Sequence, residues 1–150
     1  MAPIPPNARR TSAQRAGDAA EAHVAAQLVA RGWVVLGRQV RAGRSELDLV
    51  AVDPGPERCL VVVEVRWRRR RDFGLPEETL DHRKLTRLRA GLGRLLDAGR
   101  LPDGTALPDL PVRLDLVVMA PPACETVLRG SATIARSVER GVAGTAGGRR

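Results

Sequence analysis

The chain has 150 residues and a formal net charge of +8, from 25 Lys and Arg against 17 Asp and Glu. This length suits one domain with a hydrophobic core of its own. No segment approaches the roughly 20 consecutive apolar residues of a membrane-spanning helix, and the first ten residues, MAPIPPNARR, lack the apolar stretch of a secretory signal. Two cysteines, Cys59 and Cys124, predict neither a disulfide framework nor a metal-ligand pattern. We therefore expect a cytoplasmic protein that does not bind membranes.

The excess of positive charge lies mostly near the two ends. Residues 1–15 carry three arginines and no acid, residues 125–150 carry five arginines and two acids, and residues 16–124 hold 17 cations and 15 acids. Of the 25 cations, 24 are Arg and one, Lys84, is Lys. A GC-rich coding sequence also produces this bias, so arginine alone is a weak indicator of phosphate binding. Clustered arginines that follow one strand are more informative: Arg68, Arg69, Arg70 and Arg71.

The first half of the chain predicts a helix followed by three strands. Residues 1–15 show no periodicity, and we interpret them as a flexible arm. From about Ala16 the apolar residues recur at helical spacing, and Gly32 is a suitable stop. Glu21 lies near the edge of this apolar stripe. Strands are expected at 33–40, 46–53 and 59–66, with turns at 41–44 and 54–56.

Alternation along the second and third strands brings charged side chains together. Glu46 and Asp48 share one face of their strand, and Glu64 and Arg66 share a face of the next. The opposite faces are apolar: Leu47, Leu49, Ala51, Val61, Val63 and Val65. An ionised carboxylate within an apolar run costs several kcal/mol unless it has a partner. Two interpretations stay open, a divalent-metal site, because hard cations take oxygen ligands, and an internal ion-pair network with Arg66 and nearby arginines.

The second half predicts a helix and one further strand. A polar loop leads to a helix at 79–98, which has leucines at helical spacing and ends before Gly99. This helix carries His82, Lys84, Arg87 and Arg94. Residues 112–119 alternate as a strand with Asp115 in its middle, where pairing with an arginine is the expected role. Residues 126–140 are compatible with a short strand or a helical turn. The expected domain spans 16–122, and 123–150 is expected to be a largely flexible extension.

Several segments, taken in order, resemble the YraN-like family of small bacterial proteins. They are GDAAEAHVAAQLVARGW, RSELDLVAVD, VVVEVRWRRRRDFG, HRKLTRL and VRLDLVVM, within roughly residues 16–120. This family is grouped with the PD-(D/E)XK nuclease superfamily and resembles archaeal Holliday-junction resolvases. The resemblance implies an α/β fold with a restriction-endonuclease-like αβββαβ core, in which a mixed sheet is flanked by helices.

The resemblance also implies a catalytic set: Glu21, Asp48, Glu64, Arg66 and Lys84. The helix acid of the family falls on Glu21, the hairpin aspartate on Asp48 and the acid of the E-x-K motif on Glu64, and these three would bind Mg²⁺ or Mn²⁺. Such a cation activates water for attack on a phosphodiester. The acid of the family's GEIDL pattern falls on Glu46, as a supporting acid, and Ser45 stands in place of its glycine.

The lysine of the E-x-K motif is Arg66 in this chain, and a guanidinium cannot lose its proton in this setting. We therefore expect a nucleic-acid-binding protein, with metal-dependent cleavage of structured or single-stranded DNA as the implied activity. Phosphate contacts are expected from the arginines 68–71, His82 and Arg87. The alternatives are a catalytically silent nucleic-acid-binding module and a protein-interaction subunit that keeps the fold. A homodimer and a DNA-processing protein partner are both compatible with this reading.

Overall fold

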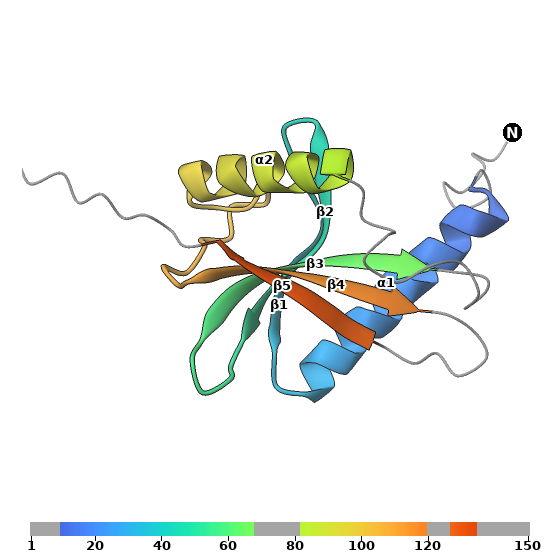
Figure 1. The fold of residues 1–150 in the computed structure, drawn as a ribbon, viewed down its shortest axis with the longest axis horizontal. Coiled ribbons are helices and arrows are strands. Elements are labelled where there is room, and N and C mark those ends of the chain that lie inside the picture. Colours follow the sequence, from blue (N-terminus) through green and yellow to red (C-terminus); the bar gives the residue numbers. More distant parts are fainter. Residues whose placement is uncertain (1–9, 68–81, 120–126, 135–150) are drawn as a thin grey trace, which may run out of the picture.

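A computed structural model describes residues 10–67, 82–119 and 127–134 of the chain, the last segment as backbone. The chain forms two helices and five strands, in the order α1 (Ser12–Ala30), β1 (Val34–Ala42), β2 (Ser45–Asp53), β3 (Cys59–Trp67), α2 (His82–Ala98), β4 (Val112–Met119) and β5 (Val127–Ile134) (Figure 1). This order confirms the α/β class and the αβββαβ core. None of the helices in the described ranges is long and apolar enough to cross a membrane.

Helix α1 begins earlier than the sequence predicted. Thr11 is its N-cap, accepting a hydrogen bond from the amide of Gln14, whose side chain in turn accepts from the amide of Thr11. This capping box fixes the start of the helix at Ser12, four residues before the expected position. Residues 12–15 therefore belong to the helix and not to the arm, while residues 1–9 lie outside the described ranges. The predicted stop is confirmed, because Gly32 follows the helix with φ of 86°.

The sheet is mixed, with the strand order β1-β2-β3-β4-β5. Neighbouring strands are antiparallel except β3 and β4, which are parallel and are connected through α2. The turn between β1 and β2 is tighter than the predicted 41–44, since β1 continues to Ala42 and Gly43 adopts a φ of 63°. Strand β5 resolves the open alternative at 126–140 in favour of a strand. It lies within the extension that we expected to be largely flexible, where it pairs with the edge of β4.

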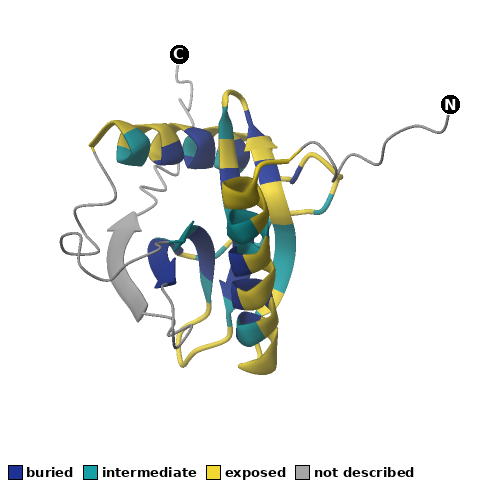
Figure 2. Ribbon diagram, turned by 90° about the vertical axis from the view of Figure 1, so that its right-hand side faces the viewer, coloured by how far each residue is buried: buried dark blue, intermediate teal, exposed yellow. Residues whose placement is uncertain are grey.

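The two helices cover opposite faces of the sheet (Figures 1 and 2). On the α1 face Val24 and Leu28 pack with Val61 and Val63, as alternation along β3 predicted. On the α2 face three leucines of the helix pack against inward-facing residues of the first four strands: Leu88, Leu92 and Leu95 against Val40, Leu47, Val50, Val52, Leu60, Val62, Val112 and Leu114.

The predicted sharing of one face by Leu47 and Leu49 is wrong. Leu47 belongs to the core under α2, whereas Leu49 belongs to the core under α1. The first half of β2 pairs with β1 alone, because its pairing with β3 covers only Leu49–Asp53. Without β3 alongside, this half of the strand curves toward α2 (Figure 1), so simple alternation does not hold across the bend. The bend also opens the sheet beside Asp48.

Candidate active site

The candidate site lies where β2 separates from β3. The last paired residues are Leu49 and Val63, and the amide of Val65 donates instead to Asp48 Oδ2 at 2.8 Å. A backbone amide within a sheet requires an acceptor. The Asp48 carboxylate thus replaces the missing strand partner, and this hydrogen bond holds it next to Glu64.

Glu64 is buried, with 3 % of its surface exposed. Its Oε1 lies 3.1 Å from Lys84 Nζ, on α2, and 3.5 Å from Arg66 Nε, on the same strand. The contact with Arg66 is an ion pair without hydrogen-bond geometry. Glu64 Oε2 has no hydrogen-bond partner among the described residues. One oxygen of this carboxylate is therefore neutralised by two cations, while the other is buried without a donor.

The electrostatics of the site centre on Asp48. Burial and the Asp48 charge raise the pKa of Glu64 to about 7, although Lys84 opposes the shift. Burial and the same Asp48 charge raise the pKa of Glu21, on α1, to about 7 as well. The Asp48 charge therefore acts on Glu21 of α1 and on Glu64 of β3, and we call these three acids the carboxylate cluster. Lys84 approaches Glu64 from the second helix.

Gln39, on β1, contacts this cluster, and no sequence pattern predicted its role. Its side-chain amide donates to Glu21 Oε2 at 3.2 Å and to Asp18 Oδ1 at 3.3 Å. Gln39 has φ of 48° and is the only non-glycine residue with positive φ in the described ranges. That conformation is uncommon for glutamine, and it turns the side chain toward α1. The place of Asp18 beside this site could have been predicted from the sequence, because Asp18 precedes Glu21 by three residues and so lies on the same face of the helix.

The donor set fits a cation held by two carboxylates. Within the described ranges no three His, Cys, Asp or Glu side chains lie close enough together to hold a metal ion. Asp48 and Glu64, however, approach within hydrogen-bonding reach of each other, and Glu64 Oε2 lacks a donor there. Mg²⁺ usually takes one or two carboxylates and keeps several waters. Asp48 and Glu64 could hold it in this way, and the direct ligand role of Glu21 stays a prediction.

The remaining predicted residues lie outside this cluster. Glu46 is exposed and pairs with Arg41 at 3.7 Å. His82 and Arg87 are exposed on α2. The arginine run 68–71 lies outside the described residues. Ser45, which we treated as a turn residue, ties α2 to the hairpin, because its hydroxyl donates to the Arg87 carbonyl at 2.9 Å.

Asp115 is the partner of an arginine, as predicted. Arg113 Nε and Nη2 each donate to its carboxylate at 2.8 Å, and Nη2 also donates to Asp53 at 3.0 Å. These bonds raise the pKa of Arg113. The Arg113 guanidinium also stands 5.7 Å from the ring centroid of Trp33. This network joins β4 to β2 and has no part in the carboxylate cluster.

Residues 20–119 match the model of the Uncharacterised protein family UPF0102. The chain belongs to this family. It is 40 % identical over 112 residues to a UPF0102 protein of Roseiflexus castenholzii, covering 75 % of this chain and 82 % of that protein. It is 41 % identical over 108 residues to a UPF0102 protein of Symbiobacterium thermophilum, covering 72 % and 84 %. The resemblance to the YraN-like family is thereby confirmed, and the fold agrees with the PD-(D/E)XK superfamily.

Among solved structures, SfsA of Pyrococcus furiosus in complex with Ca²⁺ aligns with 80 % of this chain and 64 % of that one. The identity is 14 % and the TM-score is 0.25. A likeness at this level supports no statement about the site or its ligands.

Proposed function

We propose that this UPF0102 protein binds DNA in the cytoplasm and cleaves it as a Mg²⁺-dependent endonuclease. The observation that carries the proposal is the meeting of Asp48, Glu64 and Lys84 at the point where β2 leaves β3. Two carboxylates forced together, one with a buried oxygen lacking a donor, form an arrangement that a divalent cation would stabilise. A bound Mg²⁺ would supply an activated water and stabilise the leaving oxygen of a phosphodiester.

Arg66 and Lys84, the two cations at Glu64, would each supply one part of the role of the E-x-K lysine. Arg66 supplies fixed positive charge near a phosphate, because its guanidinium stays protonated. Lys84 carries an amine that can exchange a proton and orient a water molecule. Both contact the same oxygen of Glu64. The exchange of lysine for arginine on the strand therefore leaves a lysine amine beside the acid.

The exposed side of α2 supports a path for DNA toward this site. His82 and Arg87 lie there with Arg83 and Arg89, on the helix that also carries Lys84. Exposed arginines on one helix can neutralise several phosphates. We also propose that the arginines 68–71 contact DNA and that the protein prefers structured or single-stranded DNA. A homodimer and a DNA-processing protein partner remain part of this proposal.

The test is cleavage of linear, branched and single-stranded DNA in Mg²⁺ or Mn²⁺. We expect weak cleavage by the parent and about tenfold more with Arg66→Lys, equivalent to about 1.4 kcal/mol of barrier. Lys84→Arg keeps the positive charge beside Glu64 but cannot give up a proton, so it should reduce cleavage at least about tenfold. Lys84→Ala should do the same in both backgrounds. DNA affinity and thermal unfolding of each variant serve as controls.

The second candidate is a catalytically silent nucleic-acid-binding module, which the arginine at position 66 favours. An inactive parent that still binds DNA, and that Arg66→Lys does not rescue, would establish this alternative. A parent that binds no nucleic acid at all would contradict both, and would leave the protein-interaction subunit.

A further inference from the structure

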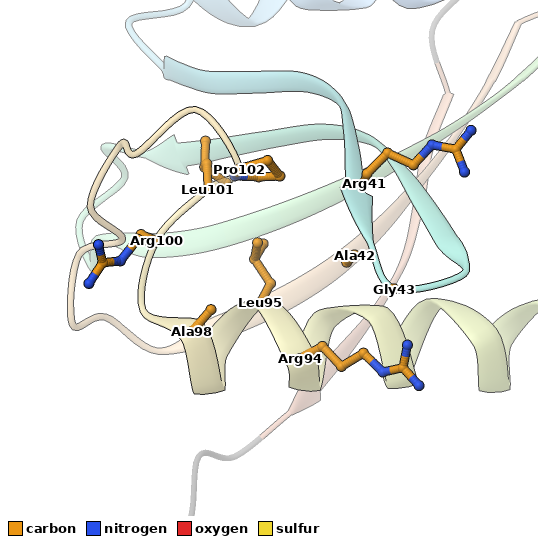
Figure 3. A pocket seen from close by; sticks show the side chains of 9 residues that line it. All are labelled: Arg41, Ala42, Gly43, Arg94, Leu95, Ala98, Arg100, Leu101 and Pro102. Carbon is orange, nitrogen blue, oxygen red and sulfur yellow. The ribbon is translucent and has the colours of Figure 1, made fainter.

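A groove runs along β1 at the edge of the sheet, on the side of α2. Its first part is a pocket of about 340 Å³ between the end of α2, the β1–β2 turn and the chain that follows the helix (Figure 3). Its lining residues are Arg41, Ala42, Gly43, Arg94, Leu95, Ala98, Arg100, Leu101 and Pro102. This volume lies at the small end of the range for ligand pockets, about 300–1,000 Å³.

A second hollow of about 230 Å³ continues the groove along β1. It shares Arg41, Leu101 and Pro102 with the first, and it extends to Arg38 and Gln39. Gln39 is the residue whose side chain donates to Glu21. The groove therefore leads from the C-terminal end of α2 to the residue that borders the carboxylate cluster.

Two glycines let the walls of the groove approach closely. The Arg94 guanidinium lies over Gly43, in the space where a side chain at that position would begin. A Cβ at Gly37 would lie only 2.9 Å from Leu101 Cδ1. Close packing against both glycines therefore shapes the groove and places Arg94 at its rim.

The lining combines an apolar floor with a cationic rim. Ala42, Leu95 and Leu101 are buried, whereas the three arginines of the pocket are exposed. Arg41 pairs with Glu46 at 3.7 Å. Within the described ranges, neither Arg94 nor Arg100 has a carboxylate within 4 Å. One acid, Asp103, lines the second hollow.

The spacing of the arginines indicates what such a groove would take. Arg41 and Arg94 extend toward the same side of the pocket, and Arg100 lies at its other end (Figure 3). A matching ligand needs separate negative charges with an apolar part between them. A nucleic-acid strand has this pattern, because its phosphates alternate with sugars and bases. Ala98 and Pro102 are exposed between the charges and could contact an unpaired base, which favours a single strand.

We propose that this groove binds a single-stranded segment of nucleic acid that flanks the carboxylate site. Phosphates contact Arg94 and Arg100, and a sugar or base rests on Ala98 and Pro102. The inference rests on the proposed function and names the part of the substrate that the enzyme holds away from the cleaved bond. With no aromatic residue lining the groove, the affinity should come mainly from charge and depend steeply on salt.

The test measures binding of a fluorescent oligothymidylate to the full chain by anisotropy over a range of salt. The double variant Arg94→Ser/Arg100→Ser should weaken binding at least about tenfold. The negative slope of log K against log salt should become shallower by about 1.4, since each single-strand phosphate contact contributes about −0.7. The matched control, Arg31→Ser/Arg58→Ser, removes the same charge from exposed positions outside the groove and away from α2. It should leave the slope nearly unchanged.

A second variant tests shape apart from charge. Ala98 is exposed and lines the pocket, so Ala98→Trp should fill it without disturbing the core. We expect weaker binding of the oligonucleotide with an unchanged salt slope, and unchanged binding of a blunt duplex. If the parent binds DNA but the groove variants behave like the control pair, the groove proposal is overturned and the proposed function stands. If the parent binds no nucleic acid, the proposed function itself fails.

Discussion

Replacing Glu64 with glutamine tests whether the carboxylate cluster is built for a cation. Burial and the Asp48 charge raise the pKa of Glu64 from 4.5 to about 7. The folded protein therefore binds this proton more tightly than the unfolded chain does. In the metal-free protein the contribution of Glu64 to the free energy of unfolding falls as the pH rises from about 4.5 to about 7, and it stays low above that window.

The size of the effect follows from the pKa shift. Each pKa unit corresponds to about 1.4 kcal/mol, so ionised Glu64 costs the metal-free fold about 3 kcal/mol near pH 8. Glutamine has the shape of the neutral acid and cannot ionise. Glu64→Gln should therefore raise the free energy of unfolding by up to about 3 kcal/mol near pH 8 and change it little near pH 4. For a chain of this size, that gain corresponds to a Tm increase of roughly 6–12 °C.

The assay is thermal unfolding followed by circular dichroism, with EDTA or with Mn²⁺. Mn²⁺ at 100 times its Kd should stabilise the parent by about 2.7 kcal/mol, and Glu64→Gln should lose most of that gain. Glu57→Gln, in the exposed turn after β2, is the matched control. A Glu64→Gln protein that is less stable than the parent near pH 8 would refute the reasoning. Glu64 would then be the structural partner of Lys84, and breaking such a buried pair costs about 3–5 kcal/mol.

Three further predictions concern the surroundings of the cluster. Gln39→Ala should weaken Mn²⁺ binding about tenfold in calorimetry, as loss of an outer-sphere hydrogen bond does. Gln39→Asn should retain most of the affinity because asparagine tolerates positive φ. If Gln39→Ala binds Mn²⁺ as tightly as the parent, Gln39 is not part of the site. Gly91→Ala should lower stability by about 1–3 kcal/mol and reduce cleavage, because its Cβ would lie 2.8 Å from Ser45 Cβ and displace α2. The control Gly93→Ala meets no atom within 4 Å and should stabilise the helix by about 0.5–1 kcal/mol; similar losses in both would exclude a packing cause. Arg113→Met should lower the free energy of unfolding in urea by about 3 kcal/mol, because it leaves Asp53 and Asp115 unpaired. Its Mn²⁺ affinity should equal that of the parent, and a change in that affinity would show that the Arg113 network reaches the site.

Sequence patterns predicted the parts of the site that depend on regular strands. Alternation placed Glu64 and Arg66 on one face of β3, and their ion pair at 3.5 Å confirms it. The order of helix and strand segments predicted the αβββαβ core, and the resemblance implied that Lys84 would belong to the same site as Glu64. Each of these inferences needs only regular periodicity or a motif contained in one segment.

The other features of the site depend on tertiary contacts between segments that are distant in the sequence. Leu47 and Leu49 lie in different cores because β2 bends after leaving β3, and no local pattern marks that bend. Gln39 enters the site through a left-handed backbone conformation that glutamine does not favour by itself. Ser45 looked like a neutral change in a turn, but its hydroxyl bonds to the helix that carries Lys84. Tertiary contacts decide all three.

The identity of the cation at position 84 is the strongest chemical argument for catalysis. In this chain 24 of 25 cations are arginine, so a position that needs positive charge alone would be expected to hold arginine, as position 66 does. The single lysine lies 3.1 Å from the buried Glu64, where the second cation is already a guanidinium. Charge neutralisation does not require an amine there, since a guanidinium neutralises an acid as well. Exchanging a proton with water does require one. Under the proposed function the lysine on α2 would supply the proton exchange that the arginine on the strand cannot, and Ser45 and Gly91 lie where the helix that carries this lysine packs against β2.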